Sequence, residues 1–301
     1  MNGRYAFTLG LTGAIALGSS LGAQQFRFPH DEPIRVNTGK DVIRHVREHF
    51  GPVTVIEQPS NDDPCRDHGW DDDQFRSCEV REYTMPAGGL TVDAGRNGGI
   101  RVEGWDRNEI HVQAVVTASA RREADAKRLA SDVQVQAGGG HVSSNGPSTE
   151  SRQWWSVSYR IHVPRHNDLD LNANNGGVTI SGVTGNMKFD TTNGGVTLRD
   201  LGGDVRGQTR NGGLKVFLSG DRWDGAGIDV ETSNGGVELT IPERYNADLT
   251  TRTVNGGFRT DYPMTIQGEL LPRRGLSTTL GAGGAPIRVR TTNGGLRITK
   301  K

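Results

Sequence analysis

The chain has 301 residues, of which 43 are glycine and 6% are aromatic. Lysine and arginine together number 35, as do aspartate and glutamate, so the formal net charge is zero. This balance gives no sign of a nucleic-acid-binding protein or of a charged tail that binds a membrane surface, and we expect no nucleic-acid partner.

Residues 1–23 have the features of a secretory signal peptide. Arg4 and the α-amino group form a positive n-region, and 5–17 is mostly apolar but short for a bilayer span. Small residues follow, and we predict cleavage after Ala23, with Gly22 as the alternative site. No later apolar run is long enough to cross a membrane. We therefore expect an exported mature chain, in the periplasm or at the cell surface, without an integral membrane segment.

Residues 24–84 are predicted to form an N-terminal segment outside the repeat described below. Apolar residues at helical spacing indicate a helix over 41–50, and a short strand follows within 51–59. The segment holds both cysteines of the chain, Cys65 and Cys78. In an oxidising compartment they are expected to pair, and closing a loop of about 14 residues would contribute on the order of 3 kcal/mol.

The loop between the cysteines allows a rival interpretation as a metal site. It contains His68 and Asp71–Asp73, but their spacing fits no zinc pattern, and carboxylates alone do not specify calcium. We predict the disulfide, with no metal and no cofactor.

Residues 89–118 alternate apolar and polar side chains, which indicates strands separated by glycine-rich turns. A helix is predicted over 119–133, with Ser119 as its N-cap. Ala124, Leu129 and Val133 are expected to share its buried face. The following 141–163 segment reads as two strands around a loop, and together with the helix it is expected to cap the repeat.

The motif Asn-Gly-Gly occurs seven times. The stretch TTNGGVTL at 191–198 returns along 164–301 with its asparagines 18, 18, 23, 21 and 38 residues apart, and the last interval is long enough for two rungs. In a looser copy at 95–102, the apolar residues before the asparagine are one residue out of register with those of the other copies. This copy is either a bulged rung or part of the cap. A period near 20 with strand-like content is typical of a β-solenoid. We therefore predict an all-β fold, a single-stranded parallel β-helix-like solenoid over 85–301 with one capping helix.

Alternation within each copy divides its side chains between two faces. Apolar residues lie six and four positions before each asparagine and three and five after it, and threonine usually lies two before. This parity puts the asparagines on the inward face, where stacked amides hydrogen-bond along the axis. The predicted ladder comprises Asn175, Asn193, Asn211, Asn234, Asn255 and Asn293.

The two glycines after each asparagine are predicted to form the corner of the rung. Glycine adopts positive φ at little cost, and its missing Cβ lets neighbouring rungs approach. An anion-binding nest is the functional alternative, but seven copies favour a corner.

Outward positions carry opposite charges on successive copies. We expect three ion pairs between neighbouring rungs that favour the register: Asp170–Lys188, Arg206–Asp229 and Glu231–Arg252. At the C-terminus, Lys300 and Lys301 are expected to lie beside the last strand and discourage edge pairing.

The chain resembles the bacterial putative-adhesin β-strand-repeat family, which is related to toastrack-type envelope domains. The opening GRNGGIRVEGWDRNEIHVQA, the YRIHVP strand and the serial T-x-N-G-G-V-x-L rungs carry this resemblance over roughly 88–301. The resemblance implies a β-solenoid in an exported or envelope protein with no established enzymatic activity, and no functional residue follows from it.

The first functional hypothesis is therefore a structural or interaction module, adhesin-like, whose rigid solenoid presents a surface to an envelope protein or a glycan. The aromatic residues most suited to a contact surface are Trp105, Trp154, Trp155, Tyr159 and Trp223. Packing at the cap is the alternative role for each of them. No binding residue is assigned by the sequence.

The alternatives are a polysaccharide lyase or glycosidase and an envelope-stress sensor. An enzyme would need converging carboxylates, for which Asp190, Asp229 and Glu231 are candidates, although basic neighbours explain them as charge pairs. Histidines without a visible acid partner lie mainly in the cap region: His111, His141, His162 and His166. No catalytic residue stands out, and a sensor would need a separate signalling partner.

Overall fold

The computed structural model describes residues 64–65, 74–261 and 274–301, and the backbone of a few short strands elsewhere. The chain separates into two compact units, Met1–Arg66 and Asp67–Lys301. The first contains the short strands β1 (Tyr5–Thr8), β2 (Ala14–Ala16), β3 (Gln25–Phe26), β4 (Ile34–Arg35) and β5 (Ile56–Glu57). The predicted cleavage site at Ala23, the helix over 41–50 and the acidic loop Asp71–Asp73 lie outside the described residues.

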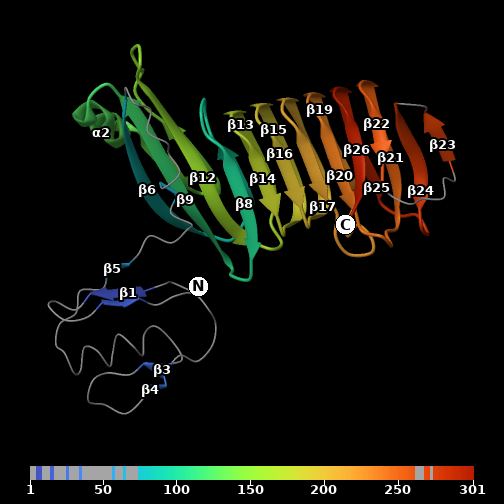
Figure 1. Cartoon of the computed structure of the whole chain (residues 1–301), viewed down its shortest axis with the longest axis horizontal. Coiled ribbons are helices and arrows are strands. Elements are labelled where there is room, and N and C mark those ends of the chain that lie inside the picture. Colours follow the sequence, from blue (N-terminus) through green and yellow to red (C-terminus); the bar gives the residue numbers. More distant parts are fainter. Residues whose placement is uncertain are drawn as a thin grey trace. The chain divides into compact units, whose positions relative to one another are not determined.

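The second unit consists of two long sheets that enclose one core (Figure 1). In spatial order the eleven-stranded sheet comprises β10 (Gln134–Gly138), β11 (His141–Asn145), β7 (Leu90–Asp93), β13 (Leu169–Asn175), β15 (Thr184–Asn193), β17 (Gly202–Asn211), β19 (Gly227–Asn234), β25 (Pro286–Asn293), β21 (Ala247–Asn255), β24 (Gly275–Leu280) and β23 (Gly268–Leu271). The ten-stranded sheet comprises β22 (Phe258–Thr260), β26 (Leu296–Lys300), β20 (Val237–Ile241), β18 (Leu214–Phe217), β16 (Val196–Arg199), β14 (Val178–Ser181), β8 (Ile100–Trp105), β12 (Trp154–Pro164), β9 (Glu109–Ala120) and β6 (Phe75–Pro86).

Each repeat contributes one strand to each sheet, joined at its Asn-Gly-Gly corner. Successive repeats pair in parallel and in register, so Leu171 lies beside Phe189, and Val178 lies beside Val196. The predicted all-β solenoid is confirmed, with α2 (Glu123–Asp132) as the helix of its described part. Residues 75–84, which the sequence analysis assigned to the N-terminal segment, lie in β6, which pairs with β9.

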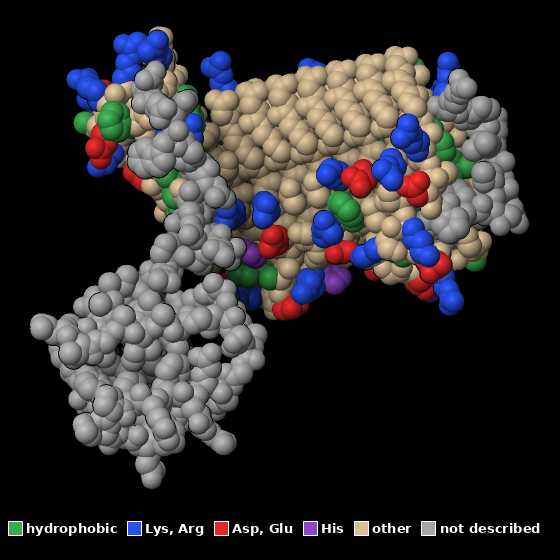
Figure 2. All heavy atoms as spheres, in the orientation of Figure 1, with side chains coloured by type: hydrophobic (Ala, Val, Ile, Leu, Met, Phe, Trp, Pro, Cys, Tyr) green, Lys and Arg blue, Asp and Glu red, His purple; other side chains and the backbone are tan. Residues whose placement is uncertain are grey.

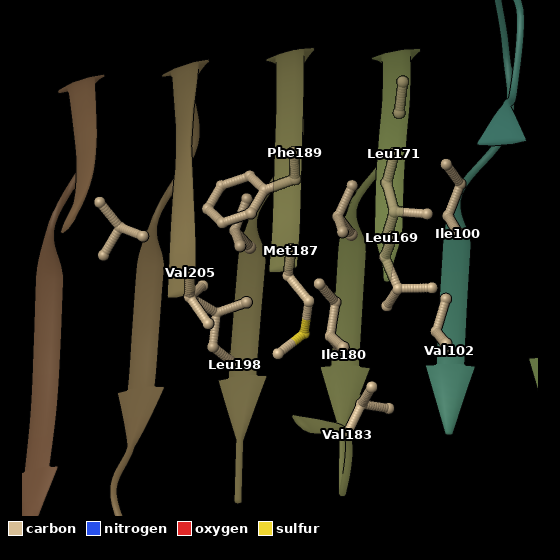
Figure 3. Close-up of a cluster of buried hydrophobic side chains, with 14 of the residues drawn as sticks. Ile100, Val102, Leu169, Leu171, Ile180, Val183, Met187, Phe189, Leu198 and Val205 are labelled. Atoms are coloured by element: carbon tan, nitrogen blue, oxygen red, sulfur yellow. The ribbon is translucent and has the colours of Figure 1, made fainter. Parts of the chain in front are cut away.

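The core fills the space between the sheets with the inward residues of both strands of each rung (Figure 3). Side-chain sizes complement each other between rungs. Phe189 lies beside Gly207 on the next strand, where an added Cβ would come within 2.5 Å of the Phe189 ring. The ring thus occupies the volume that the glycine leaves, as close packing requires. At the far end the alternation fails, because Thr260 in the edge strand β22 is exposed.

The C-terminal strands do not continue the stack in sequence order, which corrects the prediction of two rungs between Asn255 and Asn293. After β21 and β22 the chain forms β23 and β24, which pair antiparallel with each other, and β24 pairs antiparallel with β21. It then returns so that β25 lies between β19 and β21, and β26 lies between β20 and β22. Lys300 therefore ends an interior strand and pairs with Glu243 at 2.7 Å, so the predicted edge protection by lysines is wrong.

The first Asn-Gly-Gly copy is a bulged rung, one of the two alternatives that the sequence left open. Leu90 lies beside Leu169, but Asn97 bridges to Asn175 and Ile100 lies beside Val178, so β7–β8 holds one residue more than β13–β14. The extra residue is accommodated near Gly95, whose φ is 63°.

The corner glycines are required by close approach between rungs. A Cβ on the first glycine of a corner would lie 2.0 Å from the carbonyl oxygen of the preceding rung's glycine at Gly212 and 2.1 Å at Gly194. In the six regular copies the corner glycines do not adopt positive φ, so the prediction of positive φ is wrong there; Gly98 of the bulged rung, with φ of 154°, is the exception. The second glycine is less crowded: at Gly213 an added Cβ would meet its nearest atom at 3.5 Å.

The helix α2 is shorter than predicted, because Ser119 belongs to β9 and the N-cap residue is Arg122. Its buried residues are Ala126, Leu129 and Ala130, whereas Ala124 is exposed; Val133, just beyond the helix, is buried as predicted. The sequence pattern placed the apolar stripe incorrectly, since this helix has only one long apolar side chain.

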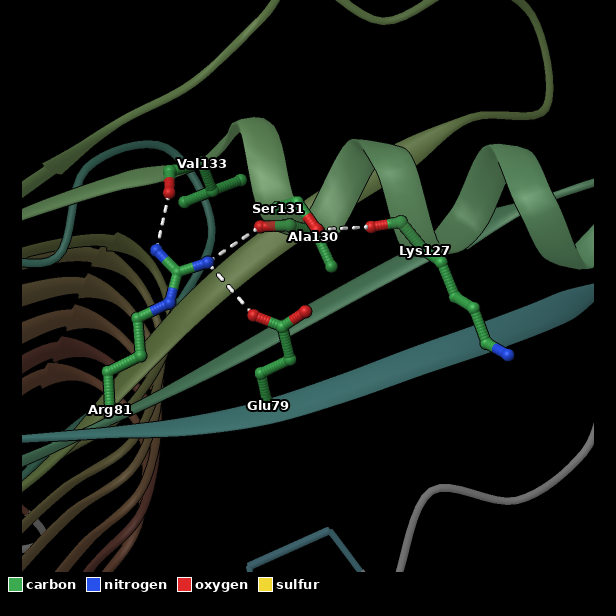
Figure 4. Close-up of polar contacts among 6 residues, drawn as sticks. All are labelled: Glu79, Arg81, Lys127, Ala130, Ser131 and Val133. Atoms are coloured by element: carbon green, nitrogen blue, oxygen red, sulfur yellow. Dashed lines mark hydrogen bonds and ion pairs between the residues drawn. The ribbon is translucent and has the colours of Figure 1, made fainter.

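An arginine from β6 holds the C-terminal end of α2 (Figure 4). The Arg81 guanidinium donates to the carbonyl oxygens of Val133 at 2.5 Å and Ala130 at 2.9 Å, and it pairs with Glu79 at 3.0 Å. A cation at this end satisfies carbonyl groups that the helix leaves unpaired and opposes the negative end of its dipole.

Candidate functional site: an aromatic cleft at the end of an asparagine ladder

The corner asparagines form a continuous hydrogen-bonded ladder along one edge of the solenoid. Each side-chain Nδ2 donates to the Oδ1 of the preceding rung at 2.8–2.9 Å. In spatial order, these residues are Asn175, Asn193, Asn211, Asn234, Asn293 and Asn255.

The ladder faces solvent, so the prediction of inward asparagines is wrong. All six side chains are exposed, while the threonine two residues earlier is buried, as at Thr191 and Thr209. The alternation of inward and outward side chains along the strand ends at the corner, because the asparagine is the first residue of the turn. The buried threonine hydroxyl donates to a corner glycine of the neighbouring rung, for example from Thr191 to the oxygen of Gly176 at 3.0 Å.

The ladder has a direction, and its first member is Asn97 of the bulged rung. Asn175 Nδ2 donates to Asn97 Oδ1 at 3.1 Å and to the Arg96 oxygen at 2.8 Å. In each of the six later asparagines, one N–H group of the side-chain amide therefore points along the ladder toward Asn97. Along the corners, Figure 2 shows a broad strip largely without charged or hydrophobic side chains.

A cleft of about 370 Å³ lies where the ladder begins. Its volume falls within the range of small-ligand sites. Three groups line it: the first two corners, the loop between β11 and β12, and the start of β12. The lining residues are Arg96, Asn97, Pro147, Ser148, Thr149, Gln153, Trp154, Trp155 and Asn175.

Backbone contacts hold β12 and its tryptophans over the first corner. Val157 N donates to the Asn97 oxygen at 3.1 Å, and a Cβ at Gly98 would lie 1.9 Å from the Val157 oxygen. Only glycine fits there. Since Trp154 and Trp155 come just before Val157, this attachment places both indoles beside the ladder's first member.

The two indole rings are held in different ways. Trp155 Nε1 donates to the Pro147 oxygen at 2.9 Å, and its ring packs so closely on Gly146 that a Cβ there would lie 2.7 Å from Cε2. The Arg76 guanidinium lies 5.5 Å from the centre of the Trp154 ring, as a cation–π pair. Both rings are half-buried, so part of each is open to solvent.

The other aromatic candidates do not join this cleft. Tyr159 and Trp223 are buried in the core, with exposed fractions of 1% and 6%. Trp105 lies on the ten-stranded sheet and stacks with His162 and His111 at centroid distances of 5.1 and 6.1 Å. The contact-surface hypothesis therefore narrows to Trp154 and Trp155. Their convergence on Asn97 and Asn175 could not be read from the sequence, because the register of β12 on the first rung is a tertiary feature.

The stacked histidines have acidic neighbours, contrary to the sequence analysis. His111 Nε2 lies 3.7 Å from Glu82 and His162 Nε2 lies 3.7 Å from Glu103, because β6 and β8 flank β9 and β12. Partial burial lowers the pKa of His162, against the opposing effect of Glu103. His141 and His166 are exposed and lie away from this stack: His141 begins β11, and His166 lies in the turn between β12 and β13.

A second, more open hollow of about 630 Å³ lies over β15, β17, β19 and β25. It gathers the three candidate carboxylates together with Asp204. Asp190 accepts a hydrogen bond from Gln208 at 2.6 Å, while Arg290 pairs with Asp229 at 2.8 Å and with Glu231 at 3.4 Å.

This arrangement corrects the predicted ion pairs between rungs. Since β25 is inserted between β19 and β21, Glu231 lies beside Arg290 and not beside Arg252. Arg206 is a register neighbour of Asp229 but pairs with Asp204 at 3.0 Å. Asp170 and Lys188 are register neighbours, with no ion pair between them.

Cys65 and Cys78 are disulfide-bonded, as the sequence predicted. Within the described residues, no three histidine, cysteine, aspartate or glutamate side chains are arranged to hold a metal ion. In the same part of the chain, no helix has both the length and the apolarity to span a bilayer.

The fold and its corners define a class of protein, the two-sheet β-solenoids whose rungs turn at glycine-rich corners. Within this class the chain belongs to the Toastrack family DUF4097, whose sequence profile matches residues 87–299. The predicted family resemblance is confirmed. No curated protein sequence matches the chain.

Similar solved structures include a putative cell adhesion protein from Clostridium sporogenes, with 8% identity, 75% of this chain and 100% of that chain covered, and a TM-score of 0.42. A putative adhesin from Bacteroides fragilis has 12% identity, 75% and 97% coverage and a TM-score of 0.30. A putative lipid binding protein from Parabacteroides distasonis has 11% identity, 74% and 96% coverage and a TM-score of 0.32.

Proposed function

We propose that the chain is an exported cell-envelope protein that acts by binding, in an adhesin-like manner, and not by catalysis. The signal-like residues 1–23 and the disulfide support export, because disulfides persist in oxidising compartments. The solenoid is the scaffold, with the ladder and the disulfide in structural roles.

One observation carries the binding role: the cleft offers aromatic rings and amide groups without a carboxylate among its lining residues. Aromatic faces with a few placed polar groups are typical of binding sites. General acid–base catalysis would need a proton-transferring side chain, which this cleft does not supply.

The test is to express the chain with its own N-terminus, fractionate the cells and determine the mature N-terminus. We expect cleavage after Ala23 and recovery of the protein in the periplasm or at the surface. The purified mature chain should also bind isolated envelopes saturably. An uncleaved chain confined to the cytoplasm, or no saturable binding, would contradict the proposal.

A polysaccharide-acting enzyme remains the second candidate, because the open hollow gathers Asp190, Asp204, Asp229 and Glu231. Glycoside hydrolysis needs two carboxylates with different roles, one of them protonated. Here Arg290 pairs with both Asp229 and Glu231, so neither carboxylate is free of a basic partner. Release of reducing ends from envelope polysaccharide, lost in Asp229→Asn and Glu231→Gln, would establish this alternative instead.

A further inference from the structure

The cleft has a surplus of hydrogen-bond donors. Within the described residues, the Arg96 guanidinium, the Asn97 Nδ2 group and the Trp154 indole N–H have no hydrogen-bond partner. Arg96 is also the only charged residue among those that line the cleft. Donors without acceptors, beside a positive charge, suit a ligand that brings acceptors and negative charge.

The ladder strengthens this preference at Asn97. The ladder asparagines between its two ends accept at Oδ1 and donate at Nδ2 toward Asn97, so the array ends at the cleft in the Nδ2 group of Asn97. Hydrogen bonds in such a chain polarise one another, which makes the final donor stronger. The ladder thus presents a positive end, much as a helix N-terminus does.

The remaining lining residues fit a sugar. Indole rings offer flat apolar faces for the C–H surface of a pyranose ring, and Ser148, Thr149 and Gln153 provide groups that both donate and accept hydrogen bonds with hydroxyls.

We propose that this cleft binds a carboxylate-bearing unit of an acidic glycan. The carboxylate lies against Arg96 and Asn97 Nδ2, and the sugar ring lies against the open part of the Trp154 indole. This assignment rests on the proposed binding function and specifies its ligand class.

The test uses the purified mature chain and matched ligands. Oligouronates of galacturonate, glucuronate and alginate type are titrated by calorimetry, each against its methyl ester, which keeps the ring and removes the charge. We expect at least one free acid to bind about tenfold more tightly than its ester, as a charge-assisted hydrogen bond would give.

Variants assign the effect to the cleft. Arg96→Gln should remove the difference between acid and ester, and Trp154→Ala should weaken both by about tenfold. Asn97→Asp keeps the Oδ1 acceptor for Asn175 and replaces the donor with a negative charge, so it should abolish binding of the acid. Arg210→Gln is the matched control, because Arg210 precedes Asn211 as Arg96 precedes Asn97 but does not line the cleft.

Thermal melting checks that each variant folds. No binding by any free acid of the panel, equal binding of acids and esters, or an unchanged preference in Arg96→Gln would overturn the assignment. If envelope binding persisted in such a case, the proposed function would stand and only the ligand assignment would fail. Loss of export or of all envelope binding would instead contradict the proposed function.

Discussion

At the scale of single residues, the two glycines of a corner have different structural roles although they are adjacent in the sequence. The first lies against the backbone of the neighbouring rung, so its missing side chain sets how closely rungs can stack. The second has room for a methyl group at most corners of the central rungs. The asparagine before them is exposed and forms the solvent-facing ladder, because the chain has already begun to turn at that residue.

This difference predicts that Gly212→Ala destabilises the solenoid far more than Gly213→Ala. The new Cβ at position 212 would lie 2.0 Å from a backbone oxygen, a clash that only a backbone shift can relieve. A Cβ at position 213 would lie 3.5 Å from its nearest atom, which is an ordinary contact distance. We expect about 2–4 kcal/mol for the first change and less than about 1 kcal/mol for the second. Urea unfolding of the two variants, read by circular dichroism, measures both. Equal losses would mean that rung spacing does not depend on the first glycine.

At the scale of elements, the helix α2 is attached to the solenoid by specific contacts. The helix α2 packs against β9 and β6 with few large side chains, and its C-terminal carbonyl groups are satisfied by Arg81 from β6. The N-terminal end of α2 has no such support, because Arg122 forms no side-chain capping bond. The arginine therefore anchors the C-terminal end of the helix.

Replacing Arg81 with glutamine should destabilise the unit by about 1–2 kcal/mol, because two charge-assisted hydrogen bonds to helix carbonyls are lost. Hydrogen exchange of the α2 amides should accelerate more than exchange in β15 or β17. Arg128→Gln serves as the control, since its pair with Asp125 is exposed and is expected to contribute less than about 0.5 kcal/mol. Unchanged α2 protection in the Arg81 variant would contradict this role.

At the scale of the whole solenoid unit, one core runs between the sheets and contains two tyrosines. Burial raises the pKa of Tyr159 from 10.0 to about 12, and burial also raises the pKa of Tyr245. A folded-state pKa above the unfolded value means that the neutral hydroxyl stabilises the fold below pH 10 and that this contribution is lost as the pH rises toward 12.

We therefore predict a loss of stability between pH 10 and 12 in which Tyr159 accounts for about 2–3 kcal/mol. Tyr159→Phe keeps the ring and lacks the ionising hydroxyl, so its stability should fall less over the same interval. Urea midpoints of both proteins at neutral and alkaline pH make the comparison, and lysine deprotonation affects both equally. Parallel pH dependences would show that Tyr159 does not stay neutral in the folded chain.

The sequence by itself determined the rung, the alternation of side chains such as Val178 and Ile180, and the positions of the corners, because these patterns depend on neighbours a few residues away. It could not determine the order of the rungs. Inserting β25 between β19 and β21 satisfies the same local pattern as adding it at the end, and only the antiparallel pairing of β24 with β21 selects between them. The same insertion of β25 beside β19 brings Arg290 into ion pairs with Asp229 and Glu231. The cleft is likewise tertiary: stacking of the first two rungs brings Asn97 to Asn175, and Trp154 joins them because Val157 of β12 hydrogen-bonds to the first corner.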